Sequence, residues 1–468
     1  VERYEPGSRY WKQHDPAKSP DVMAQVQRHL RDVARHYHAL AQQQNKQPVY
    51  AEAGRWYRLY LNAFPKSEQA PLMNFLYAEL LTSSAQHGAA ASEYERTAYA
   101  YGQHDKAAEA GYAALLAYQK HEPTLTGHSK AEWHRAGINS ALRFATEFPH
   151  HKQALPVRTR AAQQLYALKD HTAAIAAAQP VTESGAAPGA MQLSAWTVIA
   201  HAQFDLQDYQ RAEGAYQQVL ARSGRSDEQY EKLQEKLAAS IYKQGEQEKL
   251  AGNLSAAADH FLRIADAVPT SNVNTTAQYD AAAAYIALKR WPEAIAILER
   301  WRRSNPEHKL QADVTRKLAV LYRENSQPLR AAGEFERIAG SEKDPSLRRE
   351  AAWTTATLYQ QSGRDRQSID AYRRFVEQFP RPMEQAMEAR YQLVQLYGKS
   401  NDAGKQRFWR QQIVEAERTA GPDRTDRTRF LAAHARLALV AGDYAAYKSV
   451  KLREPLKDSL ARKKKFMK

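Results

Sequence analysis

The chain has 468 residues, of which 43% are hydrophobic and 10% aromatic, enough apolar side chain to bury a core of a folded protein. It has no cysteine, which excludes disulfides and thiol catalysis, and no apolar run approaches the roughly 18 residues of a membrane-spanning helix. The net charge of +15 is spread along the chain, which favours basic side chains that solvate helix faces, and only 448–468 is a concentrated basic run.

The N-terminal half is predicted to form helical hairpins of irregular spacing, after an extension over residues 1–20. Four segments within 21–189 carry this pattern: "YRLYLNAFPKS", "YERTAYAYGQHDKAAEAGYAALLAY", "ALRFATEFPHH" and "LYALKDHTAAIAAAQPV". Phe-Pro pairs recur where a second helix would end, because proline cannot continue a helix. These pairs are Phe64-Pro65, Phe148-Pro149 and, further along, Phe379-Pro380.

The C-terminal half contains residues that recur every 37 positions. The five series are Phe261, Leu298, Phe335, Tyr372 and Trp409; Tyr285, Tyr322 and Tyr359; Gly245, Ala282, Ala319 and Ala356; Ala257, Ala294, Ala331 and Ser368; and Pro269, Pro306 and Pro380, with Lys343 at the missing position. Coincident series at one period indicate a repeat protein. Each unit is predicted to be two antiparallel helices that approach closely at the small residues, with proline after the second helix.

These offsets resemble the tetratricopeptide-repeat (TPR) pattern, W-x2-L-G-x2-Y followed by A-x3-F and P. The preceding segment "WTVIA…RAEGAY" contributes Trp196, Ala200, Ala212 and Tyr216. The resemblance implies an all-α fold, a TPR-type α-solenoid of about ten helical hairpins that form a superhelix with an inner groove lined by first helices. The regular array is expected over 190–418, and a C-terminal helical hairpin and basic tail over 419–468.

Two segments resemble bacterial periplasmic TPR proteins of outer-membrane assembly, Tol–Pal-linked or TonB-associated systems and gliding motility. They are "AYRRFVEQFPRPMEQAMEARYQLVQLY" (371–397) and "AAEAGYAALLAYQKHE" (107–122). The resemblance implies an exported scaffold of the cell envelope, in the periplasm and associated with the outer membrane, with a cytoplasmic location left open. The chain begins at Val1 rather than Met, which indicates a processed precursor or a trimmed chain and leaves open whether a signal peptide or lipid anchor preceded it, and the native chain is expected to continue past Lys468.

Signatures of catalysis are missing. No GxxxxGK[ST], GxGxxG, HExxH or GxSxG motif occurs. Among the 16 histidines, His36 and His38 fall on different faces of a helix, and the pair His150-His151 follows a proline in a loop. We therefore predict no catalytic residue, no metal site and no cofactor, and expect a protein that is not an enzyme.

Partner binding is predicted on the inner face of the first helices. Residues three before and four after the small position share that face, because i, i+3, i+4 and i+7 align along a helix. The candidates are Thr197, His201, Tyr279, Arg316, Arg323, Trp353 and Gln360. Trp353 between arginine-bearing turns suits a peptide clamp, although packing against the next repeat would explain it equally.

Three functions remain open at this point. The first is an envelope scaffold that binds proteins or peptide segments through the groove. The second is a TPR subunit of an exopolysaccharide secretion machine, whose basic surface would bind an acidic polysaccharide. The third is a helical-repeat RNA-binding protein, which the irregular inner positions disfavour. Binding that is lost steeply with added salt would support a polyanion partner, whereas salt-insensitive peptide binding would support the scaffold.

Overall fold

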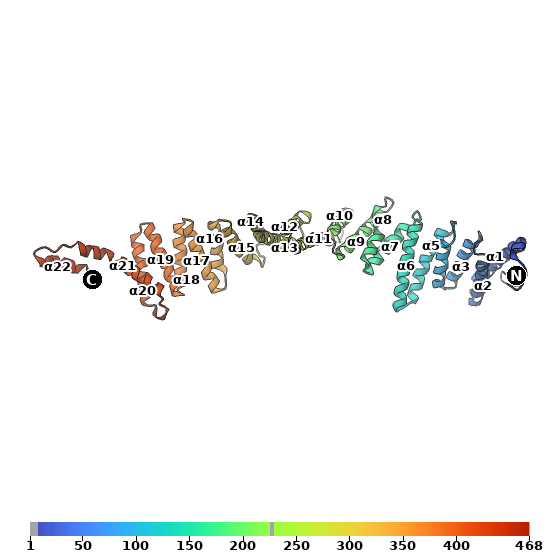
Figure 1. The fold of residues 1–468 in the computed structure, drawn as a ribbon, viewed down its shortest axis with the longest axis horizontal. Helices are drawn as coiled ribbons and strands as arrows, with labels where there is room; N and C mark the ends of the chain where they lie inside the picture. Colours follow the sequence, from blue (N-terminus) through green and yellow to red (C-terminus); the bar gives the residue numbers. More distant parts are fainter. Residues whose placement is uncertain (1–7, 225–228, 468) are drawn as a thin grey trace. The chain divides into compact units, whose positions relative to one another are not determined.

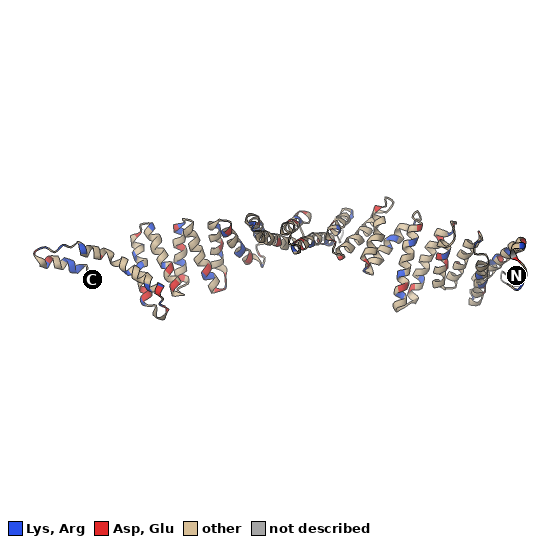
Figure 2. Cartoon of the chain, viewed as in Figure 1, with Lys and Arg blue, Asp and Glu red and all other residues tan. Residues whose placement is uncertain are grey.

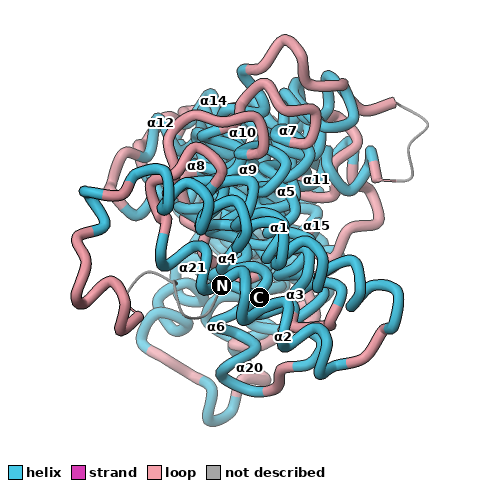
Figure 3. Tube along the Cα trace, turned by 90° about the vertical axis from the view of Figure 1, so that its right-hand side faces the viewer, coloured by secondary structure: helices cyan, strands magenta, loops and turns pink. Residues whose placement is uncertain are grey.

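The structure is a computed structural model that describes residues 8–224 and 229–467. Within these ranges the chain forms helices joined by short loops, and no strand occurs (Figure 3). The predicted all-α class is confirmed. The chain divides after Ile241 into two compact units, which are described separately below, and helix α11 (Tyr230–Leu250) contains the point of division.

In the first unit, each helix from α1 to α10 packs against the next helix in chain order (Figure 1). Contacts also join α1 to α3, α3 to α5, and α7 to α9, so the odd-numbered helices are the first helices of successive hairpins. The helices are α1 (Pro20–Gln44), α2 (Gln47–Ala63), α3 (Ala70–Ser83), α4 (His87–Tyr99), α5 (Ala107–His121), α6 (Gly127–Glu147), α7 (Ala154–Ala167), α8 (His171–Glu183), α9 (Gly189–Asp205) and α10 (Tyr209–Arg222), with the short 3-10 helices η2 (Pro16–Lys18) and η3 (Glu122–Thr124).

The second unit repeats this arrangement from the end of α11 onward. Its helices are α12 (Leu254–Ala267), α13 (Asn274–Ala287), α14 (Trp291–Ser304), α15 (Gln311–Glu324), α16 (Pro328–Ser341), α17 (Pro345–Gln361), α18 (Asp365–Gln378), α19 (Met383–Lys399), α20 (Ala403–Arg418), η4 (Gly421–Asp423), α21 (Asp426–Ser449) and α22 (Leu456–Lys465). From α12 to α21 each helix packs against the next. In the described parts of the chain, ten hairpins, α1/α2 to α19/α20, therefore confirm the predicted α-solenoid, and α21 and α22 follow them.

The recurring small residues lie where helices cross closely. Ala282, Ala319 and Ala356 are buried in first helices, and Ala294 and Ala331 are fully buried in second helices. Two further residues of the 37-residue series show how closely the helices approach each other. The buried hydroxyl of Ser368 donates to the carbonyl of Ala356 at 3.0 Å, and a Cβ at Gly245 would lie 2.6 Å from the Phe261 ring. Small side chains at this period are therefore a packing requirement.

The prolines mark the ends of second helices. Helices α12, α14 and α18 end two residues before Pro269, Pro306 and Pro380 respectively. In the first unit, α2 and α6 end one residue before the Phe-Pro pairs that begin at Phe64 and Phe148. The predicted ends of these five helices are thus confirmed, as expected for a residue that lacks the N–H of the next helical turn.

The recurring tyrosines join each first helix to the second helix of the preceding hairpin. The Tyr359 hydroxyl donates to Glu336 Oε2 of α16 at 3.1 Å, and the Tyr322 hydroxyl donates to Glu299 of α14. Arg330 also binds Glu299, with its guanidinium 4.3 Å from the centroid of the Tyr322 ring. Burial raises the pKa of the Tyr322 phenol, so it stays a donor at neutral pH.

Candidate interaction face

In the second unit, two residues predicted to bind a partner, Tyr279 and Arg316, lie close together because both contact the carboxylate of Asp313. The Tyr279 hydroxyl of α13 donates to Asp313 Oδ2 of α15 at 2.5 Å. The guanidinium of Arg316, one turn further along α15, lies 4.0 Å from the other oxygen of Asp313. Lys317 adds a cation 5.6 Å from the centroid of the Tyr279 ring. Tyr279 is thereby held between two successive first helices.

On α15, Arg316 and Arg323 flank an apolar residue on one face of the helix. Their side chains are about half exposed, and Val320 between them is 45% exposed. Spacings of four and three residues place all three on the same side. Arg316 pairs with Glu342 at 3.2 Å and Arg323 with its neighbour Glu324 at 3.7 Å. Sequence reasoning missed Val320, although the i+4 spacing from Arg316 could have found it.

Trp353 of α17 lies at the edge of a cavity of about 960 Å³. On one side its ring packs edge-on against the second helix of its own hairpin, with centroid separations of 5.5 Å to Tyr372 and 5.4 Å to Phe375. The rest of the ring lines the cavity. The other lining residues are Arg381, Pro382, Met383, Glu384, Gln385, Glu388, Asp423, Thr425 and Arg427, from the α18–α19 connection, α19, η4 and the start of α21.

The cavity lining carries paired charges of both signs. Arg381 lies 3.6 Å from Asp423, and Arg427 pairs with Glu388 Oε1 at 2.5 Å. Thr425 donates to Glu384 at 2.6 Å. The second oxygen of Glu388 is buried and accepts no hydrogen bond in this part of the structure. Such a lining can exchange its internal ion pairs for the amides and charged side chains of a bound polypeptide.

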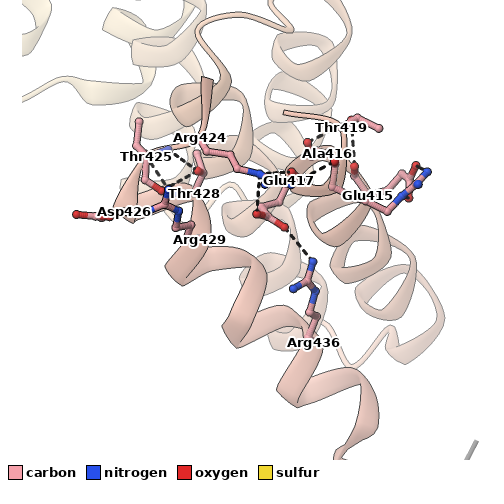
Figure 4. Close-up of polar contacts among 11 residues, drawn as sticks. Glu415, Ala416, Glu417, Thr419, Arg424, Thr425, Asp426, Thr428, Arg429 and Arg436 are labelled. Atoms are coloured by element: carbon pink, nitrogen blue, oxygen red, sulfur yellow. Dashed lines mark hydrogen bonds and ion pairs between the residues drawn. The ribbon is translucent and has the colours of Figure 1, made fainter. Parts of the chain in front are cut away.

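The start of α21 is held against α20 by a buried carboxylate. Glu417 Oε1 lies 3.1 Å from Arg424, and Glu417 Oε2 accepts from Arg436 at 2.9 Å (Figure 4). Thr425 and Thr428 cap the helix reciprocally, each side chain bonding to the other's backbone N–H. These contacts place Thr425 and Arg427 at the wall of the Trp353 cavity.

The remaining candidates use their polar atoms within the protein. Gln360 donates to Gln392 of α19 and accepts from the Tyr372 hydroxyl, both at 3.0 Å. In the first unit, His201 Nδ1 lies 2.7 Å from the Tyr216 hydroxyl, and burial lowers the pKa of its imidazole, with Lys236 acting in the same direction. Thr197 donates to the Leu193 carbonyl of its own helix at 2.8 Å. These side chains position helices.

In residues 8–224 and 229–467, no group of three or more His, Asp or Glu side chains is placed to hold a metal ion. None of the helices described is both long enough and apolar enough to cross a membrane.

Four features together define a class of protein: stacked helical hairpins, small residues at the helix crossings, tyrosines between hairpins, and prolines after second helices. The chain has the fold of a tetratricopeptide-repeat protein. Residues 234–459 match a family described as "YfiO: Outer membrane lipoprotein". None of the curated proteins compared with the sequence matches it.

Solved structures with a similar course of chain include several TPR proteins. The C-terminal part of a TPR repeat-containing protein from Cytophaga hutchinsonii is 14% identical, with 57% of this chain and 97% of that chain covered and a TM-score of 0.26. The TPR domain of P58(IPK) is 12% identical over 72% of this chain and 99% of its own, with a TM-score of 0.23. Yeast Tom70 is 11% identical, with 87% of this chain and 96% of that chain covered, and it also has a TM-score of 0.23.

Proposed function

We propose that this protein is a non-enzymatic scaffold of the bacterial cell envelope, located in the periplasm, that binds partner proteins through the first helices of its second unit. The observation that carries the proposal is the face formed by α15 and α17. There, exposed Val320 lies between two half-exposed arginines, and Trp353 lies beside a cavity that is lined by acidic and basic side chains. The match of 234–459 to a family described as outer membrane lipoprotein supports the envelope location.

The chemistry of this face fits a polypeptide segment. An extended or helical peptide could cover Val320 with an apolar side chain and pair acidic groups with Arg316 and Arg323. The cavity beside Trp353 offers an aromatic edge together with Glu384 and Arg427, which suit backbone amides and charged side chains. A polyanion would instead require a continuous basic lining, and the carboxylates of Glu384 and Glu388 interrupt it.

The experiment has two steps. A photo-crosslinking amino acid at position 320 would first capture the partner in living cells, with the same amino acid at the exposed second-helix position 373 as the control. The affinity of the captured partner would then be measured for Arg316→Ala/Arg323→Ala. We expect a loss of about tenfold or more, because charge-assisted contacts at an interface are removed, with little change in stability, since changes at exposed sites usually stay within about ±0.5 kcal/mol.

The matched control is Arg303→Ala/Arg373→Ala, which removes the same charge from exposed positions on second helices. Arg302 and Arg374 are unsuitable as controls, because Arg302 pairs with buried Glu334 at 2.7 Å and Arg374 pairs with Glu336 at 2.5 Å. Equal losses from both double variants would contradict the groove and favour diffuse attraction to an acidic polymer. Unchanged affinity in both would also overturn the proposed site.

A further inference from the structure

The C-terminal segment 437–467 exposes several large apolar side chains to solvent. Helix α21 buries residues only up to Ala435, and α22 buries none. On the second half of α21, Leu437 is 70% exposed, and Val440 and Tyr444 follow it on the same face at spacings of three and four residues. Further exposed apolar residues continue along the segment: Leu452, Leu456, Leu460 and Met467. Solvated apolar groups at this density indicate an interaction surface.

The same segment carries dense positive charge. From Lys448 to Lys468 the sequence has nine Lys and Arg residues and two acidic ones, with four consecutive cations at 462–465. The ribbon of this end of the chain is accordingly coloured blue at its Lys and Arg positions in Figure 2. As far as the structure describes this segment, none of its cations forms an ion pair. The arginines that do form ion pairs on α14 to α21 include Arg302, Arg330, Arg374, Arg427 and Arg436.

The apolar and basic groups lie on neighbouring elements. Lys463 near the end of α22 places its ammonium 4.6 Å from the centroid of the Tyr447 ring, in the last turn of α21. Leu456 and Leu460 occupy adjacent turns on one side of α22, while Lys457, Arg462 and Lys465 point to other sides. Lysine can keep its ammonium in water while its stem lies along an apolar surface.

We propose that the segment 437–467 binds the surface of an anionic lipid bilayer. Lysine-rich amphipathic helices lie in the interface plane, with leucines in the acyl boundary and cations at acidic headgroups. A second copy of the chain is a poor occupant, because two such segments would repel each other at close range. An acidic polysaccharide or nucleic acid would satisfy the cations but would leave the exposed leucines in water.

Co-sedimentation of the full chain with vesicles tests this proposal. Vesicles made of equal parts phosphatidylglycerol and phosphatidylcholine should bind the chain, whereas pure phosphatidylcholine vesicles should bind it weakly, and added salt should release it. Replacing four lysines of α22, as Lys457→Gln, Lys463→Gln, Lys464→Gln and Lys465→Gln, should weaken binding to the anionic vesicles at least about tenfold. The matched control is Lys66→Gln, Lys120→Gln, Lys130→Gln and Lys152→Gln, from exposed positions in the first unit, and it should retain binding.

A second pair of variants separates a bilayer from other polyanions. Leu456→Ser/Leu460→Ser should also weaken vesicle binding about tenfold or more, because the two leucines that enter the bilayer on binding are lost. Leu206→Ser/Leu347→Ser changes leucines that are exposed elsewhere in the chain and should not weaken it. Equal binding by the leucine variant and the unmodified chain would overturn the proposal in favour of a soluble polyanion. Failure of the unmodified chain to bind anionic vesicles would overturn it outright. Neither result depends on Arg316 or Arg323, so the groove proposal is tested separately.

Discussion

At the scale of single residues, one member of the repeat series is a glycine that an aromatic ring approaches too closely for any side chain. Gly245 of α11 faces the ring of Phe261 in α12, and a Cβ there would lie 2.6 Å from the ring carbon Cε1. At the equivalent positions Ala282, Ala319 and Ala356 a methyl group is accommodated and buried. The smallest residue is therefore required by the position of one aromatic ring rather than by backbone conformation.

We predict that Gly245→Ala destabilises the protein, although alanine is the better helix former by about 1 kcal/mol. Overpacking costs about 1–3 kcal/mol and should outweigh that gain. Chemical unfolding followed by circular dichroism would measure the shift. Gly333→Ala is the matched control, because the space around Gly333 in α16 is open, and it should stabilise. Phe261→Leu should restore part of the loss in Gly245→Ala, and a single variant as stable as the parent would contradict the argument.

At the scale of elements, the turns inside the hairpins from α11/α12 to α19/α20 use one backbone geometry with different residues. Gly252, Lys289, Ser326, Gly363 and Asn401 have positive φ between their helices. The next residue then donates back into the first helix, as Arg364 N–H does to the Tyr359 carbonyl at 2.9 Å and Gln327 N–H to the Tyr322 carbonyl at 2.7 Å. This is the helix ending that glycine usually provides.

We predict opposite signs for two substitutions at equivalent turn positions. Ser326→Gly should stabilise by about 0.5–1 kcal/mol, because the left-handed conformation costs a residue with a Cβ about 1–2 kcal/mol, and the freedom of glycine in the unfolded chain offsets part of that gain. Gly363→Ala should destabilise by about 1 kcal/mol, since its Cβ would meet no atom and only its φ of 69° is unfavourable. Urea unfolding measures both. Shifts of the same sign would show that backbone conformation does not control these turns.

Sequence periodicity predicted the elements better than it predicted the candidate site. The 37-residue series located the helix crossings and the helix ends, because residues such as Ala331 and Pro306 recur at the same place in the hairpin in most repeats. It placed Arg316 and Arg323 on one face, because that face follows from helix geometry alone. It could not predict that Gln360 binds Tyr372 and Gln392, or that Arg381 meets Asp423 beside Trp353. Those contacts depend on rotamers and on the connection from α20 to α21, which departs from the repeat.

At the scale of the whole molecule, packing in each unit is almost one-dimensional. Within the described helices, α16 contacts α15 and α17, and each of them contacts its own neighbours in turn. Stability in such an array is close to a sum of repeat terms and nearest-neighbour terms, so damage at one crossing should spread only to adjacent hairpins.

Ala331→Trp tests this locality. Ala331 is fully buried in α16, so an indole there must displace α15 or α17, at a cost of about 1–3 kcal/mol or more. Hydrogen exchange should show lost protection in α15 to α17 and unchanged protection in α1 to α10. Ala294→Trp should move the affected region one hairpin toward the N-terminus, because Ala294 holds the same position in α14. Ala312→Trp, on the exposed side of α15, is the control and should change little. A uniform loss of protection along the chain would show that the hairpins unfold as one cooperative unit and would contradict the predicted local damage.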